Sequence, residues 1–375
     1  MIHIAKPYLT KREAQSAYDA ILTGWVTQGP NVQRFEEAFA GYVGAKYAVA
    51  VSSCTTALHL SMIVSGVERG DEVICPSMSF IATANSILYV GAKPVFADVH
   101  PKTYNIDVEH VRTLVTKKTR AVLIVHQMGM PADIDAYRQL CAKYKLKLIE
   151  DAACAVGSEY KGKKIGSYSD LVCFSFHPRK VITTGEGGMV TTSNKGYYKR
   201  LRLLRQHGMS VNDRARHLSN KVIFEDYLEL GYNYRMTDIQ AAIGIKQLEK
   251  LDWIISQRRK IAGRYNDAFR DIDCIRLPLE ETGYFSNYQS YPVYIKMGAP
   301  ISRDGLMQKM LNAGISTRRG IMTAHREIAY RDFCKRCRLP VSEDISDRSI
   351  LLPLYVPMSN KEIRSVIKAF RGAFR

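Results

Sequence analysis

One stretch of the sequence brings together several side chains that can do covalent and acid–base chemistry. Between Phe174 and Gly188 lie Ser175, His177 and Lys180, which supply a hydroxyl, an imidazole and an amine. The glycines at the end of the stretch allow backbone to approach a ligand closely, because glycine has no Cβ. An ordinary glycine-rich connection between two strands is the alternative interpretation.

Two further stretches place polar groups just beyond apolar ones. Asp151 follows the apolar stretch Lys147–Glu150, and the small residues after it leave room for a flat ligand. A helix N-cap is the alternative role for this aspartate. Thr55 and Thr56 lie where a strand passes into a helix, and backbone N–H groups at a helix start bind phosphate. Simple helix capping is the alternative there.

Alternating strand-like and helix-like segments between residues 47 and 193 must position these side chains. The expected strands are Tyr47–Ser52, Glu72–Cys75, Pro94–Asp98, Ala121–His126, Lys147–Glu150, Leu171–Phe176 and Gly188–Thr192. The expected helices are Thr56–Val67, Ile81–Tyr89, Val108–Val115 and Asp133–Tyr144. This alternation predicts an α/β fold with a mostly parallel, helix-covered sheet. Ligands of such sheets bind beyond the carboxyl ends of the strands.

The pattern changes to helix after Asn233, with expected helices at Asp238–Leu251 and Ile254–Phe269. A smaller α+β unit follows, with a strand at Ser290–Ile295 and helices at Arg303–Asn312 and Asn360–Phe370. We therefore expect a large domain over residues 1–250 and a small C-terminal domain over residues 251–375.

Composition narrows the function classes. The chain has 375 residues, 46% of them hydrophobic, and a formal net charge of +18. No apolar run reaches the roughly 20 residues that a transmembrane helix needs, and the N-terminus lacks a signal-peptide pattern. The basic balance can attract nucleic acid, acidic membrane surfaces or phosphorylated small molecules, although a solvated basic surface explains it equally. We expect a cytoplasmic protein without membrane insertion.

The eight cysteines are scattered, and several lie in strand-like apolar segments. Cys334 and Cys337 form the only close pair, and a tetrahedral zinc site usually needs a second pair. We expect reduced structural thiols and no metal site.

Taken together, these stretches resemble the nucleotide-sugar aminotransferases of the DegT family, which are fold-type I pyridoxal-phosphate enzymes. The resemblance covers residues 24 to about 250, and further blocks continue it in the family's order. These blocks are Gly24–Pro30, Pro76–Asn85, Gly91–Phe96, His126–Asp133 and Gly231–Asp238.

The resemblance implies a role for each matching residue. Lys180 would hold the cofactor through a Schiff base and move the proton, and Asp151 would pair with the protonated pyridine nitrogen of the cofactor. For proton transfer, we expect burial and cations such as Arg179 to lower the pKa of Lys180 toward neutrality. Phe80 would stack on the cofactor ring.

The cofactor phosphate would be held by hydroxyls from one chain and by an amide from its partner. Ser175, Thr55 and Thr56 match the hydroxyls, and Asn233 matches a residue that reaches the phosphate of the neighbouring subunit. The resemblance therefore implies a homodimer with shared active sites.

The chain departs from the family pattern in two places. Cys154 stands where relatives have His or Gln in contact with the cofactor's phenolic oxygen, and Gln289 stands where some relatives have histidine. Four further residues are candidate contacts of the substrate: Trp25, Arg318, Arg319 and His325.

The implied activity is transfer of an amino group from glutamate to a nucleotide-linked keto sugar, typically a 4-keto-6-deoxy sugar, in the biosynthesis of amino sugars for surface polysaccharides or glycosides. A sugar dehydratase is one alternative, but such relatives have histidine in place of the lysine. In a cysteine desulfurase, the lysine typically follows its histidine directly, whereas His177 and Lys180 are separated here. A nucleic-acid-binding regulator on the same fold needs an added DNA-reading module, and we expect no nucleic-acid partner.

Overall fold

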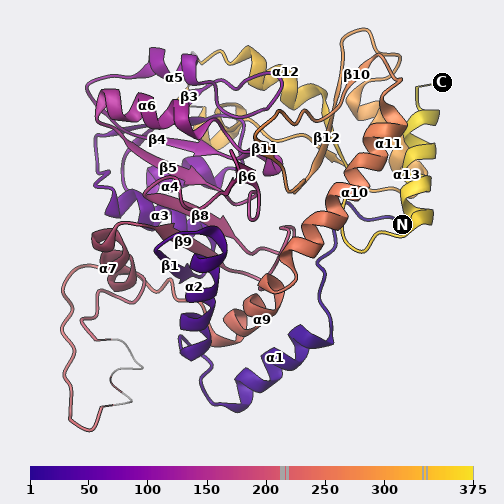
Figure 1. Cartoon of the computed structure of the whole chain (residues 1–375). Coiled ribbons are helices and arrows are strands. Elements are labelled where there is room, and N and C mark those ends of the chain that lie inside the picture. Colours follow the sequence, from indigo (N-terminus) through magenta and orange to yellow (C-terminus); the bar gives the residue numbers. More distant parts are fainter. Residues whose placement is uncertain (212–215, 217–218, 332, 335–336, 375) are drawn as a thin grey trace.

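The computed structural model describes residues 1–211, 216, 219–331, 333–334 and 337–374. Its centre is a seven-stranded sheet (Figure 1). In spatial order the strands are β1 (Tyr47–Val51), β9 (Gly188–Thr192), β8 (Leu171–Ser175), β5 (Lys147–Asp151), β4 (Thr119–Val125), β2 (Glu72–Pro76) and β3 (Lys93–Ala97). β3, β2, β4, β5 and β8 run parallel, and β9 is antiparallel to both of its neighbours. The predicted mostly parallel sheet is confirmed.

Helices cover this sheet on both faces (Figure 1). They are α2 (Pro30–Val43), α3 (Cys54–Val64), α4 (Ala82–Tyr89), α5 (Val108–Leu114), α6 (Ile134–Tyr144) and α7 (Lys195–Leu204). The central strands are buried along nearly their whole length, which explains their continuous apolar runs, since a strand covered on both faces has no solvent side.

A smaller unit follows, built on a four-stranded sheet in the order β10 (Ile275–Arg276), β12 (Tyr291–Ile295), β14 (Ser349–Leu352) and β13 (Arg318–Arg319). Its helices are α10 (Leu251–Phe269), α11 (Arg303–Asn312), α12 (Pro340–Arg348) and α13 (Asn360–Gly372). Figure 1 shows α9 (Asp238–Leu248) and α10 running from the large sheet into this unit. A third, three-stranded sheet of β6 (Glu159–Tyr160), β7 (Lys163–Lys164) and β11 (Tyr284–Phe285) joins the two halves of the chain.

The predicted domain boundary near residue 250 lies between α9 and α10 and stays a prediction. The first residues of the chain pack outside the large sheet, because Ile2 bridges Ile315 and the amide of Leu354 donates to Ile4 O. One apolar core also runs through both units, from Val32 and Phe176 to Phe370.

Among the residues that the structure describes, four helices were not predicted: α1 (Lys11–Leu22), α2, α7 and α12. Local signals for the first two are present in the sequence. Thr10 and Glu13 form a capping box at the start of α1. α2 has Pro30 in its first turn and ends at Gly44, which has a positive φ of 75°, as expected for a proline start and a glycine stop.

A buried carboxylate ties the start of α2 to α9. Asp238 is fully buried and accepts hydrogen bonds from the backbone amides of Gly29 (3.1 Å), Asn31 (3.1 Å) and Val32 (2.8 Å). Its own amide donates to Thr27 O at 2.8 Å. The blocks Gly24–Pro30 and Gly231–Asp238 are therefore one structural unit, although they are far apart in the sequence.

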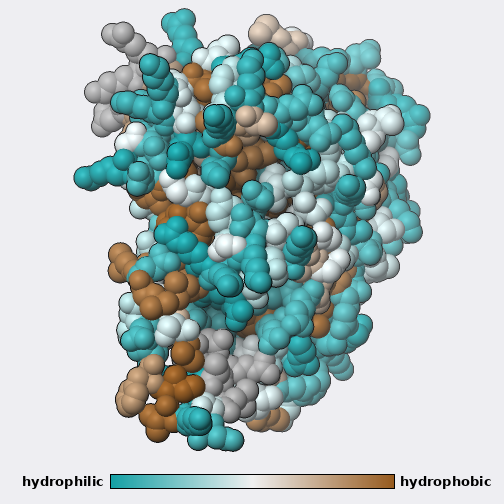
Figure 2. All heavy atoms as spheres, turned by 60° about the vertical axis from the view of Figure 1, so that its left-hand side comes forward, coloured by the Kyte–Doolittle hydropathy of each residue, from teal (hydrophilic) through white to brown (hydrophobic). Residues whose placement is uncertain are grey.

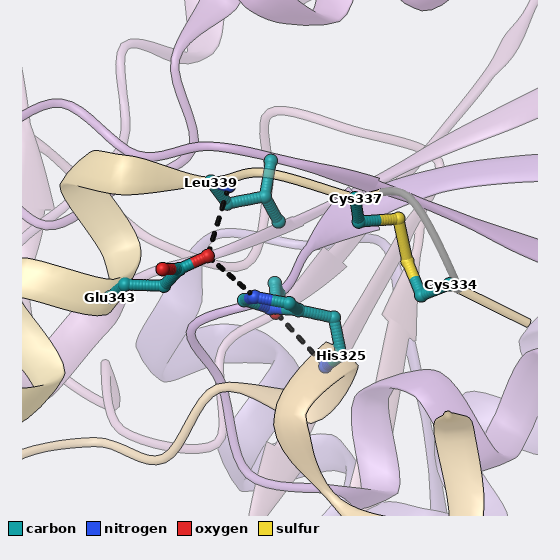
Figure 3. Close-up of a disulfide and its surroundings, with 6 residues drawn as sticks. His325, Cys334, Cys337, Leu339 and Glu343 are labelled. Atoms are coloured by element: carbon teal, nitrogen blue, oxygen red, sulfur yellow. Dashed lines mark hydrogen bonds and ion pairs between the residues drawn. A yellow bond between two sulfur atoms is a disulfide. The ribbon is translucent and has the colours of Figure 1, made fainter.

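Cys334 and Cys337 form a disulfide (Figure 3), so the expectation of reduced thiols is wrong for this pair. The other six cysteines are free. Among the described residues, no helix is long and apolar enough to cross a membrane, and no group of three or more His, Cys, Asp or Glu side chains is arranged to hold a metal ion.

Candidate active site

The ends of two neighbouring parallel strands place Asp151 and Ser175 at one edge of the large sheet. Asp151 is the last residue of β5 and pairs with Cys173 of β8, and Ser175 ends β8. Both side chains are buried. Beyond β8 the chain turns, with the amide of Lys180 donating to His177 O at 2.8 Å. The turn therefore places Lys180 at the same edge, where parallel sheets bind ligands.

Lys180 and Cys154 are in direct contact. Lys180 Nζ donates a hydrogen bond to Cys154 Sγ at 3.2 Å. The main chain on the cysteine side is anchored, since Asn287 Nδ2 donates to Cys154 O at 2.9 Å and to Val156 O at 2.9 Å. Asn287 comes from the C-terminal unit, so both halves of the chain build this contact.

The expected lowering of the Lys180 pKa is wrong for the chain without cofactor. Burial lowers the pKa of Lys180, but the hydrogen-bonded sulfur of Cys154 and the charge of Asp151 more than offset it, so the pKa lies above its ordinary value. The hydrogen bond to the sulfur and the charge of the carboxylate both stabilise the ammonium form. Lys180 therefore favours its protonated form in the isolated chain.

Asp151 is held by hydroxyl and amide donors. Its Oδ2 accepts a hydrogen bond from Thr83 Oγ1 at 2.8 Å, and Thr83 Oγ1 is also 2.7 Å from Ser79 Oγ. Its Oδ1 accepts from the amide of Ala153 at 3.1 Å. The residues after Asp151 form turns and no helix. The alternative role of helix N-cap is therefore excluded.

The start of α3 lies against the strand that follows Lys180. Ser53 is the N-cap and forms a capping box with Thr56, whose hydroxyl lies 3.1 Å from the Ser53 amide that donates to it. A Cβ on Gly188 would come within 2.4 Å of the Ser53 backbone. Only glycine permits this approach. Thr55 Oγ1 has no hydrogen-bond partner among the described residues, and it remains available to a ligand at the helix start.

Phe80 and Asn233 are both open to solvent in the single chain. Phe80 is 70% exposed and lies beyond the end of β2. Asn233 is exposed, while its backbone is paired with Gln206. The amides around it are also paired, because Tyr232 and Tyr234 donate to Leu204 O and Arg205 O. Asn233 thus projects from a fixed main chain.

Three arginines form a cationic cluster next to the lysine. The pKa of Arg318 is lowered by partial burial and by the nearby charges of Arg179 and Arg319. Arg179 immediately precedes Lys180, and its carbonyl accepts a hydrogen bond from Gln289 Nε2 at 2.8 Å. The predicted substrate residues Arg318 and Arg319 therefore lie near the lysine turn. Trp25 lies in the α1–α2 connection and is half-buried.

His325 is buried and both of its ring nitrogens have protein partners (Figure 3). Nδ1 is 2.5 Å from Ser77 Oγ, and Nε2 is 3.1 Å from Glu343 Oε1. The histidine thereby links the segment after β2, which carries Phe80, to α12. This geometry favours a positioning role over the predicted substrate contact.

Sequence reasoning gave no role to Thr83, Cys54 or Asn287. Thr83 holds Asp151, the charges of Asp151 and Lys180 act on Cys54, and Asn287 holds the Cys154 backbone. Of these residues, only Thr83 could have been recognised from the sequence. Ser79 and Thr83 both carry hydroxyls and stand at positions i and i+4 in the block Pro76–Asn85.

Comparisons with known proteins agree with this geometry. The family model of the DegT/DnrJ/EryC1/StrS aminotransferases matches residues 7–371. An uncharacterized protein of Methanocaldococcus jannaschii is 37% identical over 369 residues, covering 98% of this chain and 96% of that protein.

Two solved structures superpose closely. The aminotransferase TlmJ from Streptoalloteichus hindustanus has a TM-score of 0.91 and 32% identity, covering 99% of this chain and 98% of that one. PseC of Helicobacter pylori, an aminotransferase involved in pseudoaminic acid biosynthesis, has a TM-score of 0.92 and 27% identity, covering 100% and 99%. The chain therefore belongs to the DegT/DnrJ/EryC1/StrS family, and it is a fold-type I, pyridoxal-phosphate-dependent sugar aminotransferase.

Proposed function

We propose that this enzyme moves an amino group from glutamate to a keto sugar carried by a nucleoside diphosphate, in the cytoplasm. One observation carries the proposal: Lys180, Asp151 and the start of α3 meet at one sheet edge, beside the cationic cluster of Arg179, Arg318 and Arg319.

The residues at this edge fit pyridoxal phosphate. The donor set contains an amine for the cofactor's aldehyde, a buried carboxylate for the pyridine nitrogen and a helix start with a free hydroxyl for the phosphate. Because Gly188 has no Cβ, its backbone can lie close to the Ser53 backbone at the start of α3. Thr55, Thr56 and Ser175 would hold the phosphate, and Phe80 would cover the ring.

Bound there, the cofactor supplies an electron sink for the carbanion that develops when a proton leaves the amino acid. Asp151 would keep the pyridine nitrogen protonated, and Thr83 orients the carboxylate for that task. Lys180 would hold the cofactor and, as a free amine, would carry the proton that is transferred. Cys154, in contact with Lys180 Nζ, directs the amine while it is free.

The cationic cluster fits the diphosphate of a nucleotide-linked sugar. Arginine forks bind phosphate oxygens through paired, charge-assisted hydrogen bonds. Burial and the nearby charges of Arg179 and Arg319 lower the pKa of Arg318, and an anionic substrate would offset this repulsion. Trp25 remains a proposed substrate contact, while His325 is proposed to position the Phe80 segment.

A sugar dehydratase is the alternative within the family. The lysine at position 180 weighs against it, because the dehydratase relatives have histidine there. The hydrogen bond to Cys154 Sγ also holds the Lys180 amine in place, where the dehydratase relatives have an imidazole.

We propose that two copies complete each other's sites. Residues 219–230, which lie between α7 and Asn233, project from the large sheet at the lower left of Figure 1, and Figure 2 shows apolar side chains gathered there. Phe224 is 86% and Leu230 is 85% exposed. Exposed apolar side chains that gather in one region of the surface mark an interaction site. The segment leads directly to Asn233, which would reach the partner's cofactor phosphate.

The first prediction concerns the lysine. The purified protein should be yellow, and borohydride should lock the cofactor onto one peptide that contains Lys180, because a reduced Schiff base cannot hydrolyse. Absorbance spectra and peptide mass spectrometry measure this. Labelling of another lysine would overturn the assignment of Lys180.

The second prediction concerns the carboxylate. Asp151→Asn should fold normally and slow the half-reaction with glutamate by about 100-fold or more, since a neutral amide cannot stabilise the pyridinium charge. Stopped-flow spectroscopy of the cofactor band measures the rate. The matched variant Thr83→Val, which loses the hydrogen bond to Asp151 but keeps the charge, should have a smaller defect. Equal rates in Asp151→Asn and wild type would contradict the role.

The third prediction concerns the substrate. With a panel of nucleotide-linked keto sugars and glutamate, Arg318→Ala should raise the KM for the sugar about tenfold, because a charge-assisted phosphate contact is lost. The half-reaction with glutamate should keep its rate. Arg270→Ala, at an exposed arginine paired with Asp267, serves as the control. An unchanged KM in Arg318→Ala argues against diphosphate binding by this cluster.

The fourth prediction concerns the shared site. Mixing Lys180→Ala chains with Asn233→Ala chains should restore activity after subunit exchange, because each heterodimer regains one intact site. The intact site takes Lys180 from the Asn233→Ala chain and Asn233 from the other. Activity at limiting cofactor measures this, since dimerisation and cofactor binding are linked.

Two controls make this mixing experiment decisive. The Asn233→Ala homodimer must first be impaired at limiting cofactor, and mass spectrometry must show that heterodimers form. A mixture with proven exchange and no gain over the sum of its parents would exclude the shared site.

A further inference from the structure

The contact between Cys154 and Lys180 allows chemistry beyond cofactor binding. Lys180 Nζ lies 3.2 Å from Cys154 Sγ, and the backbone is fixed on both sides, by Asn287 at Cys154 O and by His177 O at the Lys180 amide. The amine and the sulfur are therefore held in reach of each other. A cysteine beside a lysine is an environment in which thiols are reactive.

We propose that Cys154 and Lys180 are an oxidative modification site, at which peroxide links the two side chains through a sulfur–nitrogen bond. The consequence for activity rests on the proposed function, because the linked amine cannot hold pyridoxal phosphate. The modification closes the site in the cofactor-free chain, and a thiol reductant reopens it.

The reaction balances in two steps. The Cys154 sulfur attacks one oxygen of hydrogen peroxide, the O–O bond breaks, and sulfenic acid and water result. The neutral amine of Lys180 then attacks the sulfur, the S–O bond breaks, and the hydroxide leaves as water with a proton from the nitrogen. Overall one thiol, one amine and one peroxide give one S–N bond and two waters. Sulfur loses two electrons and peroxide gains them.

Competing partners of an oxidised Cys154 are disfavoured by the surroundings. The amide of Ala155, which could form a cyclic product, is engaged with Ala152 O at 2.9 Å. Cys54 is the nearby thiol, and burial raises its pKa well above the ordinary value, which keeps it protonated and weakly nucleophilic. Cys173 Sγ lies 3.1 Å from Ser61 Oγ in the interior. Lys180 is thus the favoured partner, because its Nζ is in direct contact with Cys154 Sγ and its neutral fraction can attack there.

Cofactor on Lys180 should protect against the modification, because its amine is then occupied. The reaction should also speed up as the pH rises above neutrality. The pKa of Lys180 is raised, so most of the amine is protonated at neutral pH and the reactive neutral form grows with pH.

The test treats the cofactor-free and cofactor-bound full chain with hydrogen peroxide, then maps peptides without reductant. The expected result is a peptide around Cys154 joined to one around Lys180 in the cofactor-free sample, and little in the bound sample. The same cofactor-free sample should lose most of its uptake of pyridoxal phosphate, measured by absorbance, and dithiothreitol should restore it.

Matched variants identify the atoms involved. Each variant is compared with its own untreated sample. Cys154→Ser keeps a hydrogen-bonding side chain but cannot be oxidised, so peroxide should leave its cofactor uptake intact. Cys54→Ser should still form the joined peptide. Detection of the joined peptide itself also distinguishes the Cys154–Lys180 link from any change at the Cys334–Cys337 disulfide.

The outcomes separate this proposal from the proposed function. A Cys54–Cys154 disulfide, or Cys154 ending as sulfinic acid without a joined peptide, would overturn the modification site. Normal cofactor loading on Lys180 without any joined peptide would overturn the modification and leave the enzyme function standing. A joined peptide in a chain that never takes up pyridoxal phosphate would overturn the enzyme function and leave the modification site standing.

Discussion

The shared carboxyl edge of β4, β5 and β8 is the constraint on which the site depends. Parallel pairing brings Val125 next to Asp151 and Asp151 next to Cys173, and a slip of one residue would exchange the side chains packed on the two covered faces of a strand. Asp151, the hydroxyl of Ser175 and the turn to Lys180 therefore converge without any direct bond between them.

A second layer of polar side chains holds the loops above this edge. His126, at the end of β4, accepts a hydrogen bond from the amide of Ala132 and lies 2.8 Å from Glu150. Asp238 holds the start of α2, and Asn287 holds the turn at Cys154. Each of these groups satisfies backbone amides or carbonyls that would otherwise be buried without a partner. Several of the sequence blocks that resemble the family therefore contain residues whose side chains hold these loops in place.

The electrostatic balance of the site differs from what the residue types suggest. Burial and Arg179 should lower the pKa of Lys180, yet the sulfur and carboxylate beside Nζ raise it. The groups nearest to Nζ decide the sign of the pKa shift, since Coulomb energy falls with distance and with screening. Cys154, a departure from the family pattern, is therefore the direct partner of the amine.

The sequence by itself determined the sheet, because apolar runs and intervening helical periods are local signals, and every strand expected between residues 47 and 193 is present. It also singled out Lys180 and Asp151 as candidate site residues, because their neighbours lie in the same short blocks. Tertiary structure alone decided that Thr83 orients Asp151, that Asn287 holds Cys154 and that both nitrogens of His325 have protein partners. It also paired Cys334 with Cys337. Most of these contacts join residues that are distant in the chain, and no local pattern records them. The sign of the Lys180 pKa shift has the same origin, because it depends on which charges the fold brings within a few ångströms of one atom.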